Sequence, residues 1–181
     1  MRNTYKITIG TVTRELPLVW VSEELRIASF VILGDSEIVT EAAFLMADKL
    51  PEVDFLVTAE AKGIPFAHEV AKLKGMPRYI VARKSVKAYM EEPFVATVTS
   101  MTTHKQQKLV LDGHDAATIR GKRVALIDDV ISTGDSLRAL EALVTEAGAE
   151  IVARAAILAE GDSADREDII FLEKLPLFPA E

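Results

Sequence analysis

The apolar residues of this chain follow two different spacings, and the change of spacing predicts where strands give way to helices. Apolar residues stand at every second position through much of residues 4–21, which is typical of strands with one buried face. Residues 36–50 instead place them three or four positions apart, so this segment is predicted to be a helix. Ser36 is a suitable cap for that helix, and Pro51 ends it.

The rest of the chain continues this alternation. Further strands are predicted at residues 53–58, 78–83, 94–101, 108–112, 124–127, 151–159 and 169–172, and further helices at 65–74 and 137–147. Strands joined by helices form mainly parallel sheets, so we predict an α/β fold with a mainly parallel, twisted sheet flanked by helices. In such sheets, ligands bind at the edge where the strands end.

The chain shows no internal repeat, low-complexity tract or linker, so residues 1–181 are predicted to form a single domain. The first 35 residues match this alternation least well. We therefore expect residues 1–35 to be an N-terminal extension that forms a small hood together with the C-terminal end.

Composition argues against several classes of function. The net charge of −7 is unlike that of nucleic-acid-binding proteins, which carry basic patches. The chain has no cysteine, and therefore neither a disulfide framework nor a thiolate metal site. No apolar run is long enough to span a membrane, and the first ten residues lack the apolar core of a signal peptide. We expect a cytoplasmic protein that binds neither nucleic acid nor membrane.

The most specific pattern is the segment RVALIDDVISTGDSL at residues 123–137. An apolar strand ends in two adjacent acids, Asp128 and Asp129, and a polar turn then leads into a helix. The N–H groups of such a turn can hold a phosphate, while the acids can accept hydrogen bonds from ribose hydroxyls. The alternative is a plain strand–turn–helix junction in which Asp135 caps the helix. A buried strand seldom ends in two carboxylates without a function, and this favours a phosphosugar site.

This segment resembles the signature with which type I phosphoribosyltransferases bind phosphoribosyl pyrophosphate (PRPP), and it matches without a gap. The resemblance implies that Asp128 and Asp129 act in catalysis by orienting the ribose. It also implies that the 5′-phosphate is bound by Ser132, Thr133, Gly134, Asp135 and Ser136. Because a carboxylate repels a phosphate, we expect the side chain of Asp135 to point outward or to cap the helix.

Two other segments at strand ends are candidates for pyrophosphate binding. In the family, a loop after an earlier strand binds pyrophosphate through backbone N–H groups, and a basic pair ends the next strand. The corresponding residues here are Glu60, Ala61, Lys62 and Gly63 in the loop, Arg83 and Lys84 in the basic pair, and Lys87 shortly after it. A solvated surface lysine is the alternative for Lys62 and Lys87. The position of Lys62 before a helix N-terminus favours the functional role, whereas Lys87 stays open.

The polar segment at residues 101–108 resembles the mobile loop that closes over PRPP in this family and shields the reacting carbon from water. The predicted lid residues are Thr103, Lys105 and Lys108. Adenine enzymes usually place a Glu in this loop that protonates or orients the purine, and this chain has none there. His104 can take that role, because histidine titrates near neutral pH, but a solvent-facing histidine is an equal alternative.

Recognition of the base is predicted to involve Glu160 and Phe30. Xanthine-type enzymes place a Lys near the position of Glu160, where it meets the 6-oxo group. A carboxylate accepts a hydrogen bond from an amino group but repels a carbonyl oxygen, so Glu160 favours adenine. The 101–108 loop is more similar to that of the xanthine enzymes, so xanthine, hypoxanthine and guanine stay alternatives. Phe30 could stack on the base, although packing in the core is its alternative.

The resemblance predicts a purine phosphoribosyltransferase of purine salvage, a pentosyltransferase that moves the phosphoribosyl group of PRPP to a purine base and releases pyrophosphate. It implies a homodimer, and Mg²⁺ that is bound through PRPP oxygens and water with no direct protein ligand. The alternative is a non-catalytic sensor of PRPP or nucleotides on the same fold. Residues before Ser36 are too few and too strand-like for a helix-turn-helix, and the phosphate-binding loops are intact, so the enzyme is favoured.

Overall fold

A five-stranded parallel sheet forms the centre of the protein in the computed structural model, which describes residues 3–99 and 106–180. Its strands lie in the order β10 (Ile170–Leu175), β9 (Glu150–Glu160), β8 (Arg123–Ile131), β4 (Phe55–Ala59) and β5 (Ile80–Ala82). Every neighbouring pair is parallel. The predicted α/β fold with a mainly parallel sheet is therefore confirmed.

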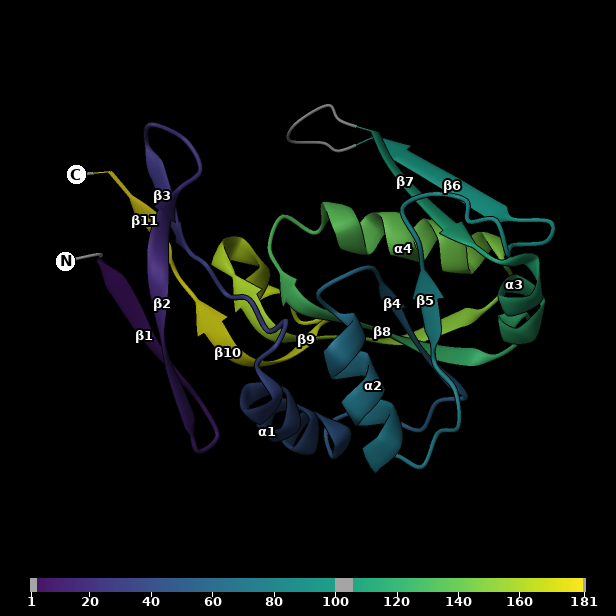
Figure 1. Ribbon diagram of the computed structural model, residues 1–181, viewed down its shortest axis with the longest axis horizontal. Coiled ribbons are helices and arrows are strands. Elements are labelled where there is room, and N and C mark those ends of the chain that lie inside the picture. The colour runs from purple at the N-terminus through teal and green to yellow at the C-terminus, as the bar shows by residue number, and fades with distance from the viewer. Residues whose placement is uncertain (1–2, 100–105, 181) are drawn as a thin grey trace.

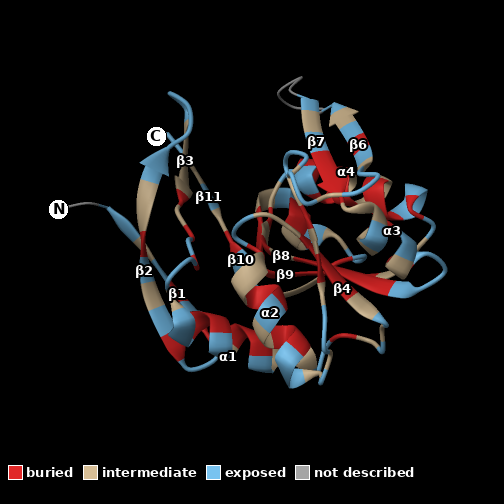
Figure 2. Cartoon of the chain, turned by 45° about the vertical axis from the view of Figure 1, so that its right-hand side comes forward, coloured by how far each residue is buried: buried red, intermediate tan, exposed pale blue. Residues whose placement is uncertain are grey.

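Helices cover both faces of this sheet, as Figure 1 shows. One face carries α1 (Ser36–Ala47) and α2 (Ile64–Leu73), and the other carries α4 (Asp135–Glu146), the short α3 (Gly113–Ile119) and the hairpin of β6 (Phe94–Thr99) and β7 (Gln106–Leu111). Buried residues concentrate in the central strands and on the helix faces turned toward them (Figure 2). Strands covered on both faces are apolar over most of their length, which explains the continuous apolar runs of β8 and β9.

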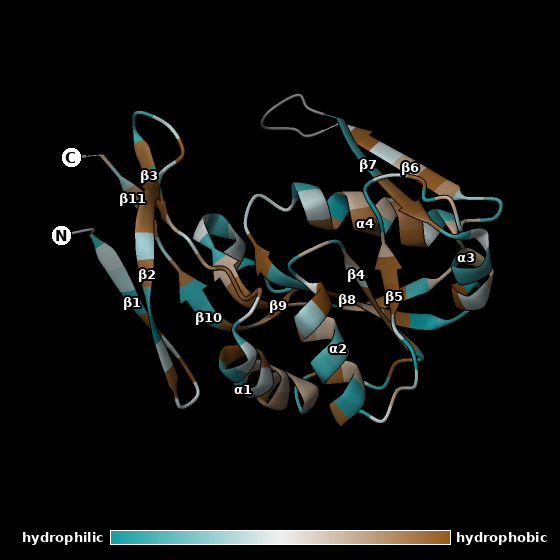
Figure 3. Ribbon diagram, viewed as in Figure 1, coloured by the Kyte–Doolittle hydropathy of each residue, from teal (hydrophilic) through white to brown (hydrophobic). Residues whose placement is uncertain are grey.

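Helix α4 has one apolar face, and this face fixes its position on the sheet. Apolar and polar residues mix along the helix in Figure 3. The buried residues Leu137, Leu140, Leu143 and Val144 recur three or four positions apart and pack toward β8 and β9. The N-terminus of α4 consequently points to the end of β8, where the two acids stand.

A separate antiparallel sheet forms the hood, at the left of Figure 1. Its strands lie in the order β1 (Thr4–Ile9), β2 (Val12–Trp20), β3 (Leu25–Ala28) and β11 (Leu177–Pro179). The alternation at residues 4–21 predicted β1 and β2, whereas β3 and β11 are too short to show a clear alternation. Strand β11 pairs with β3, with Phe178 opposite Arg26, so the C-terminal end completes the hood.

Several predicted boundaries need correction. Helix α1 is capped by Asp35, whose Oδ1 accepts a hydrogen bond from Ile38 N at 3.2 Å, and Ser36 is its first residue. Strand β7 begins at Gln106, so Lys108 lies in a strand and not in a loop. Helix α3 was not predicted, because its seven residues are too few for a helical period to show. Within the described ranges, no helix is long and apolar enough to cross a membrane.

Candidate active site

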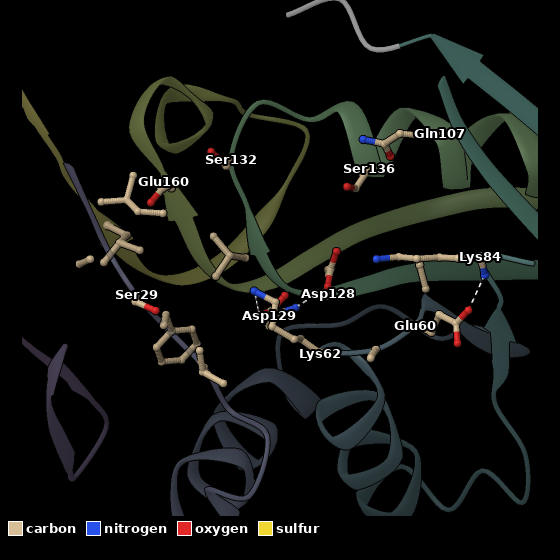
Figure 4. Close-up of a pocket in the computed structure, with 18 of the residues that line it drawn as sticks. Ser29, Glu60, Lys62, Lys84, Gln107, Asp128, Asp129, Ser132, Ser136 and Glu160 are labelled. Atoms are coloured by element: carbon tan, nitrogen blue, oxygen red, sulfur yellow. Dashed lines mark hydrogen bonds and ion pairs between the residues drawn. The ribbon is translucent and has the colours of Figure 1, made fainter. Parts of the chain in front are cut away.

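A cavity of about 440 Å³ lies between the hood and the edge of the sheet where the strands end. Its walls come from the segment after β3, the loop after β4, the segment after β5, strand β7, the end of β8 with the start of α4, and the ends of β9 and β10. In Figure 4, Ser29 and Glu160 lie toward the hood, Asp128 and Asp129 lie in the middle, and Lys84 lies at the opposite end. The volume is typical of a pocket that holds a small molecule.

The acidic pair lies at the centre of this cavity. Asp129 is only 4% exposed, and Asp128 is partly buried beside it. Oδ1 of Asp128 accepts a hydrogen bond of 2.8 Å from the backbone N of Asp129. Burial, and then the charge of Asp129, raise the pKa of Asp128 well above its usual value. Ligand hydroxyls that donate hydrogen bonds, or a cation, would therefore favour the ionised form of this acid.

Lys62 faces the acidic pair from the loop after β4. Its Nζ lies 3.2 Å from Oδ2 of Asp129, and the lysine side chain is 49% exposed. Asp129 Oδ2 is buried and has no hydrogen-bond partner in the described part of the chain, so the contact is an ion pair without hydrogen-bond alignment. An exposed cation held in this way is free to turn toward an incoming anion.

Gly63 lets this loop approach β8 closely. A Cβ at this position would lie 2.3 Å from Thr58 Oγ1 and 3.0 Å from Asp128 Oδ1, so a side chain does not fit there. The peptide bond between Glu60 and Ala61 in the same loop is cis. Gly63 also stands at the cap position of α2, so the loop leads directly into the first turn of that helix.

Glu60 binds the basic segment after β5 instead of facing the cavity as a free acid. Its Oε2 accepts a hydrogen bond of 2.8 Å from Arg83 Nε. Its Oε1 accepts one of 2.5 Å from Lys84 N, which Figure 4 marks with a dashed line. These bonds, that of Lys84 N first, lower the pKa of Glu60. Arg83 also donates from Nη1 to Tyr89 Oη at 2.8 Å. The carboxylate of Glu60 thus fixes the position of two predicted pyrophosphate residues.

The predicted pyrophosphate residues differ in their relation to the cavity. Glu60, Ala61, Lys62 and Lys84 line it, whereas Arg83, Gly63 and Lys87 are not among its wall residues. Lys87 donates from Nζ to Ser85 Oγ at 2.7 Å, which holds it within its own loop. Lys62 and Lys84 are consequently the two cations in the described part of the cavity wall, and the roles of all seven residues stay predictions.

The turn after β8 encloses a second, smaller cavity of about 90 Å³, lined by Asp128 and residues 130–137. Gly134 precedes the first residue of α4 and has φ 81°. This is a left-handed conformation, which favours glycine. Asp135 N donates to Thr133 Oγ1 at 3.3 Å. All five predicted phosphate residues line this small cavity, while Ser132 and Ser136 also line the large one.

The side chain of Asp135 does not behave as expected. It is only 6% exposed, so it does not point outward, and Gly134 instead of Asp135 stands at the cap position. Its carboxylate pairs with Arg138, one turn further along α4. The partner three residues away explains why the acid is buried, and a sequence pattern that considers only the turn misses it.

Glu160 ends β9 at the hood side of the cavity and is 8% exposed.

Ser163 is a functional candidate that the sequence reasoning missed. Its buried hydroxyl lies 2.5 Å from the carbonyl oxygen of Ile131 and 2.9 Å from that of Glu160, and it can donate to either. It therefore connects the start of the phosphate turn with the end of β9. Phe30 lines the cavity and also packs in the core, so both of its predicted roles stay open.

The predicted lid lies mostly outside the described residues, which omit Thr103, His104 and Lys105. Lys108 is exposed on β7 and is not a wall residue of the cavity. Its neighbours Gln107 and Leu109 do line the cavity. Gln107 was missed, although successive strand residues point to opposite faces and its place two before the buried Leu109 could have indicated it.

The described residues contain no group of three His, Cys, Asp or Glu side chains that could hold a metal ion by themselves. The carboxylates of Asp128 and Asp129 are adjacent in the cavity wall, and Oδ2 of Asp129 is buried without a hydrogen bond in the described part of the chain. Such a pair suits Mg²⁺ that keeps most of its waters and substrate oxygens as ligands.

Comparisons with known proteins identify close similarities. The family model of the phosphoribosyl transferase domain matches residues 33–176. A hypoxanthine/guanine phosphoribosyltransferase of Methanococcus voltae is 35% identical over 137 residues, which cover 75% of this chain and 69% of that protein. An adenine phosphoribosyltransferase of Thermosipho africanus is 32% identical over 124 residues, with coverage of 67% and 69%. The crystal structure of an adenine phosphoribosyltransferase from Thermoanaerobacter pseudethanolicus shares the fold, with a TM-score of 0.66 at 22% identity over 79% of this chain and 84% of that one.

Proposed function

Because the chain belongs to the type I phosphoribosyltransferase family, within its purine branch, we propose that it transfers the phosphoribosyl group of PRPP to a purine base, adenine by preference. The observation that carries this proposal is the junction of two cavities at Asp128, where a phosphate-sized space within the turn meets the larger cavity under the hood. A phosphosugar needs both spaces, one for its 5′-phosphate and one for its reacting end.

The order of residues along the cavity supports one orientation of the substrates. The 5′-phosphate would lie in the turn of residues 132–136, against the N-terminus of α4. The ribose would lie over Asp128 and Asp129, and the pyrophosphate would extend toward Lys62 and Lys84. The base would then lie on the hood side, near Glu160.

The proposed mechanism follows from this order. A ring nitrogen of the purine attacks the anomeric carbon, the bond to pyrophosphate breaks, and positive charge develops on the ribose in the transition state. Asp128 and Asp129 orient the hydroxyls and stabilise that charge. Lys62 and Lys84 neutralise the leaving pyrophosphate. Asp128 and Asp129 are the carboxylates that would hold Mg²⁺ through water, and the ion would there supply further positive charge toward the leaving group.

The preference for adenine rests on Glu160. A carboxylate that is 8% exposed can accept a hydrogen bond from the 6-amino group, whereas a 6-oxo group in its place would leave both groups without a donor. The second candidate is an enzyme for hypoxanthine or guanine. This candidate is favoured by the 35% identity to the hypoxanthine/guanine phosphoribosyltransferase of Methanococcus voltae.

Calorimetric titration with PRPP and Mg²⁺ tests the proposed site. The wild-type protein should bind PRPP, and Asp128→Ala/Asp129→Ala should bind it far more weakly. A matched control is Asp48→Ala/Glu52→Ala, which removes two exposed acids outside the cavity wall. Undiminished affinity in the Asp128/Asp129 variant would refute the assignment of the acidic pair.

The remaining expectations, some from the resemblance and some from composition and sequence pattern, stay predictions. These are the homodimer, the single-domain organisation, the cytoplasmic location, the lid and the acid–base role of His104. Sedimentation of the purified protein would test the homodimer directly.

A further inference from the structure

Asp135 poses an electrostatic problem for a turn that binds phosphate. It is the first residue of α4, it lines the small cavity, and it is 6% exposed. A buried carboxylate beside a phosphate dianion raises the free energy of the complex by like-charge repulsion, and low exposure weakens the screening by solvent. A turn with this residue therefore needs a compensating positive charge.

The structure places two guanidinium groups beside this turn. Arg138 donates from Nη2 to Oδ1 of Asp135. A Cβ built on Gly134 would lie 3.5 Å from Nη1 of Arg138 and 3.2 Å from Nη1 of Arg166. The two arginines thus converge on Gly134, although Arg166 follows the short 3₁₀ helix at Gly161–Asp165, well outside the turn.

Arg166 is held in place by a bidentate ion pair. Its Nε and Nη2 donate to the two carboxylate oxygens of Asp168 at 2.8 and 2.7 Å. This leaves Nη1 as the group nearest to Gly134. Arg166 is thus paired with Asp168, whereas Arg138 is paired directly with Asp135.

We propose that Arg138 is a positioning residue for phosphate binding, whose charge neutralises Asp135 so that the turn retains its affinity for the 5′-phosphate. This inference rests on the proposed function, because it presupposes that PRPP binds in the turn. Arg138 acts through Asp135 and helps to fix the first turn of α4, whose residues 135–137 line the small cavity.

A double-mutant cycle separates this role from a purely structural one. Arg138→Met should weaken PRPP binding about tenfold, because it exposes the phosphate to the charge of Asp135. Asp135→Asn/Arg138→Met should regain affinity to within about threefold of the wild type, since the repelling charge is then absent. Arg138→Lys keeps the charge and should lose less than Arg138→Met. Pyrophosphate alone, which would bind at the far end of the cavity, should bind all variants within about twofold of the wild type.

Arg78→Met removes an arginine that pairs with Asp115 outside the cavity wall, and PRPP affinity should not change. Asp135→Asn alone should bind PRPP at least as tightly as the wild type, which tests the proposal even if Arg138→Met does not fold. Wild-type affinity in Arg138→Met, or a double variant no tighter than Arg138→Met, would overturn the proposal. If the wild type binds no PRPP, the proposed function itself fails, and this inference with it.

Discussion

Lys62 and Asp129 form an ion pair across the cavity, with 3.2 Å between Nζ and Oδ2, although they belong to the ends of two neighbouring strands. The pair shows that the loop after β4 and the end of β8 border the same part of the cavity. It also shows that the acid is partly neutralised before any ligand binds. Pyrophosphate would compete with Asp129 for the lysine, which would leave both acids to the ribose.

The first prediction concerns Lys62→Ala. This variant should weaken PRPP binding by about tenfold, because one cation facing the pyrophosphate is lost. Its affinity for AMP, which has no pyrophosphate, should stay within about twofold. Calorimetry with both ligands measures the difference. Lys72→Ala removes a lysine that pairs with Glu69 on α2 and serves as the control. An equal loss for both ligands would mean that Lys62 does not face the pyrophosphate.

A second prediction follows from the raised pKa of Asp128. Burial and the charge of Asp129 disfavour its ionised form in the folded protein. A carboxyl whose folded pKa lies above its unfolded pKa destabilises the fold once the pH exceeds the unfolded value. Asp128→Asn should therefore raise the melting temperature at pH 7–8 by about 2–4 °C, which is roughly 1 kcal/mol for a chain of this size.

The pH dependence gives this second prediction its control. Below about pH 4, where the carboxyl is protonated in both states, the gain should vanish. Thermal unfolding of the wild type and Asp128→Asn between about pH 4 and pH 8 measures the difference in melting temperature. An unchanged or lower melting temperature at neutral pH would contradict an energetic cost of ionising Asp128, and the same variant should bind PRPP less tightly.

Sequence patterns predicted the local elements around the candidate site well and the long-range contacts between them poorly. The strand, acids and turn at residues 123–137 are contiguous, so their spacing alone indicated a phosphate site. The burial of Asp135 depends on Arg138 and was not anticipated, because the pattern of the turn does not include the helix after it. The position of Glu60 depends on Arg83 and Lys84, which follow a different strand. Ser29 lines the cavity just after β3, a strand that pairs with β11 from the other end of the chain.

Ser163→Ala tests whether the short helix after β9 positions the phosphate turn. The variant removes the hydrogen bonds that Ser163 offers to the carbonyl groups of Ile131 and Glu160. An unsatisfied buried acceptor costs about 1–3 kcal/mol, so the melting temperature should fall. If the serine also positions the site, KM for PRPP should rise more than kcat falls. A lower melting temperature with unchanged KM would limit Ser163 to a structural role.

The preference for a base is tested through Glu160. The wild type should show a larger kcat/KM for adenine than for hypoxanthine or guanine, by one to two decades if the mismatch costs about 1–3 kcal/mol. Glu160→Gln replaces a pure acceptor by an amide that also donates, so it should narrow this gap. Steady-state kinetics with each base under saturating PRPP measures both effects. A larger wild-type kcat/KM for any 6-oxopurine would contradict the preference and leave the phosphoribosyl transfer standing.

The most direct test of the proposed activity is the release of pyrophosphate from PRPP in the presence of Mg²⁺ and a purine base. The account predicts release that depends on the added base, that matches the nucleoside 5′-monophosphate formed in amount, and that disappears in Asp128→Ala/Asp129→Ala. Tight binding of PRPP without base-dependent release for adenine, hypoxanthine, guanine or xanthine would contradict it and would favour a PRPP sensor on the same fold.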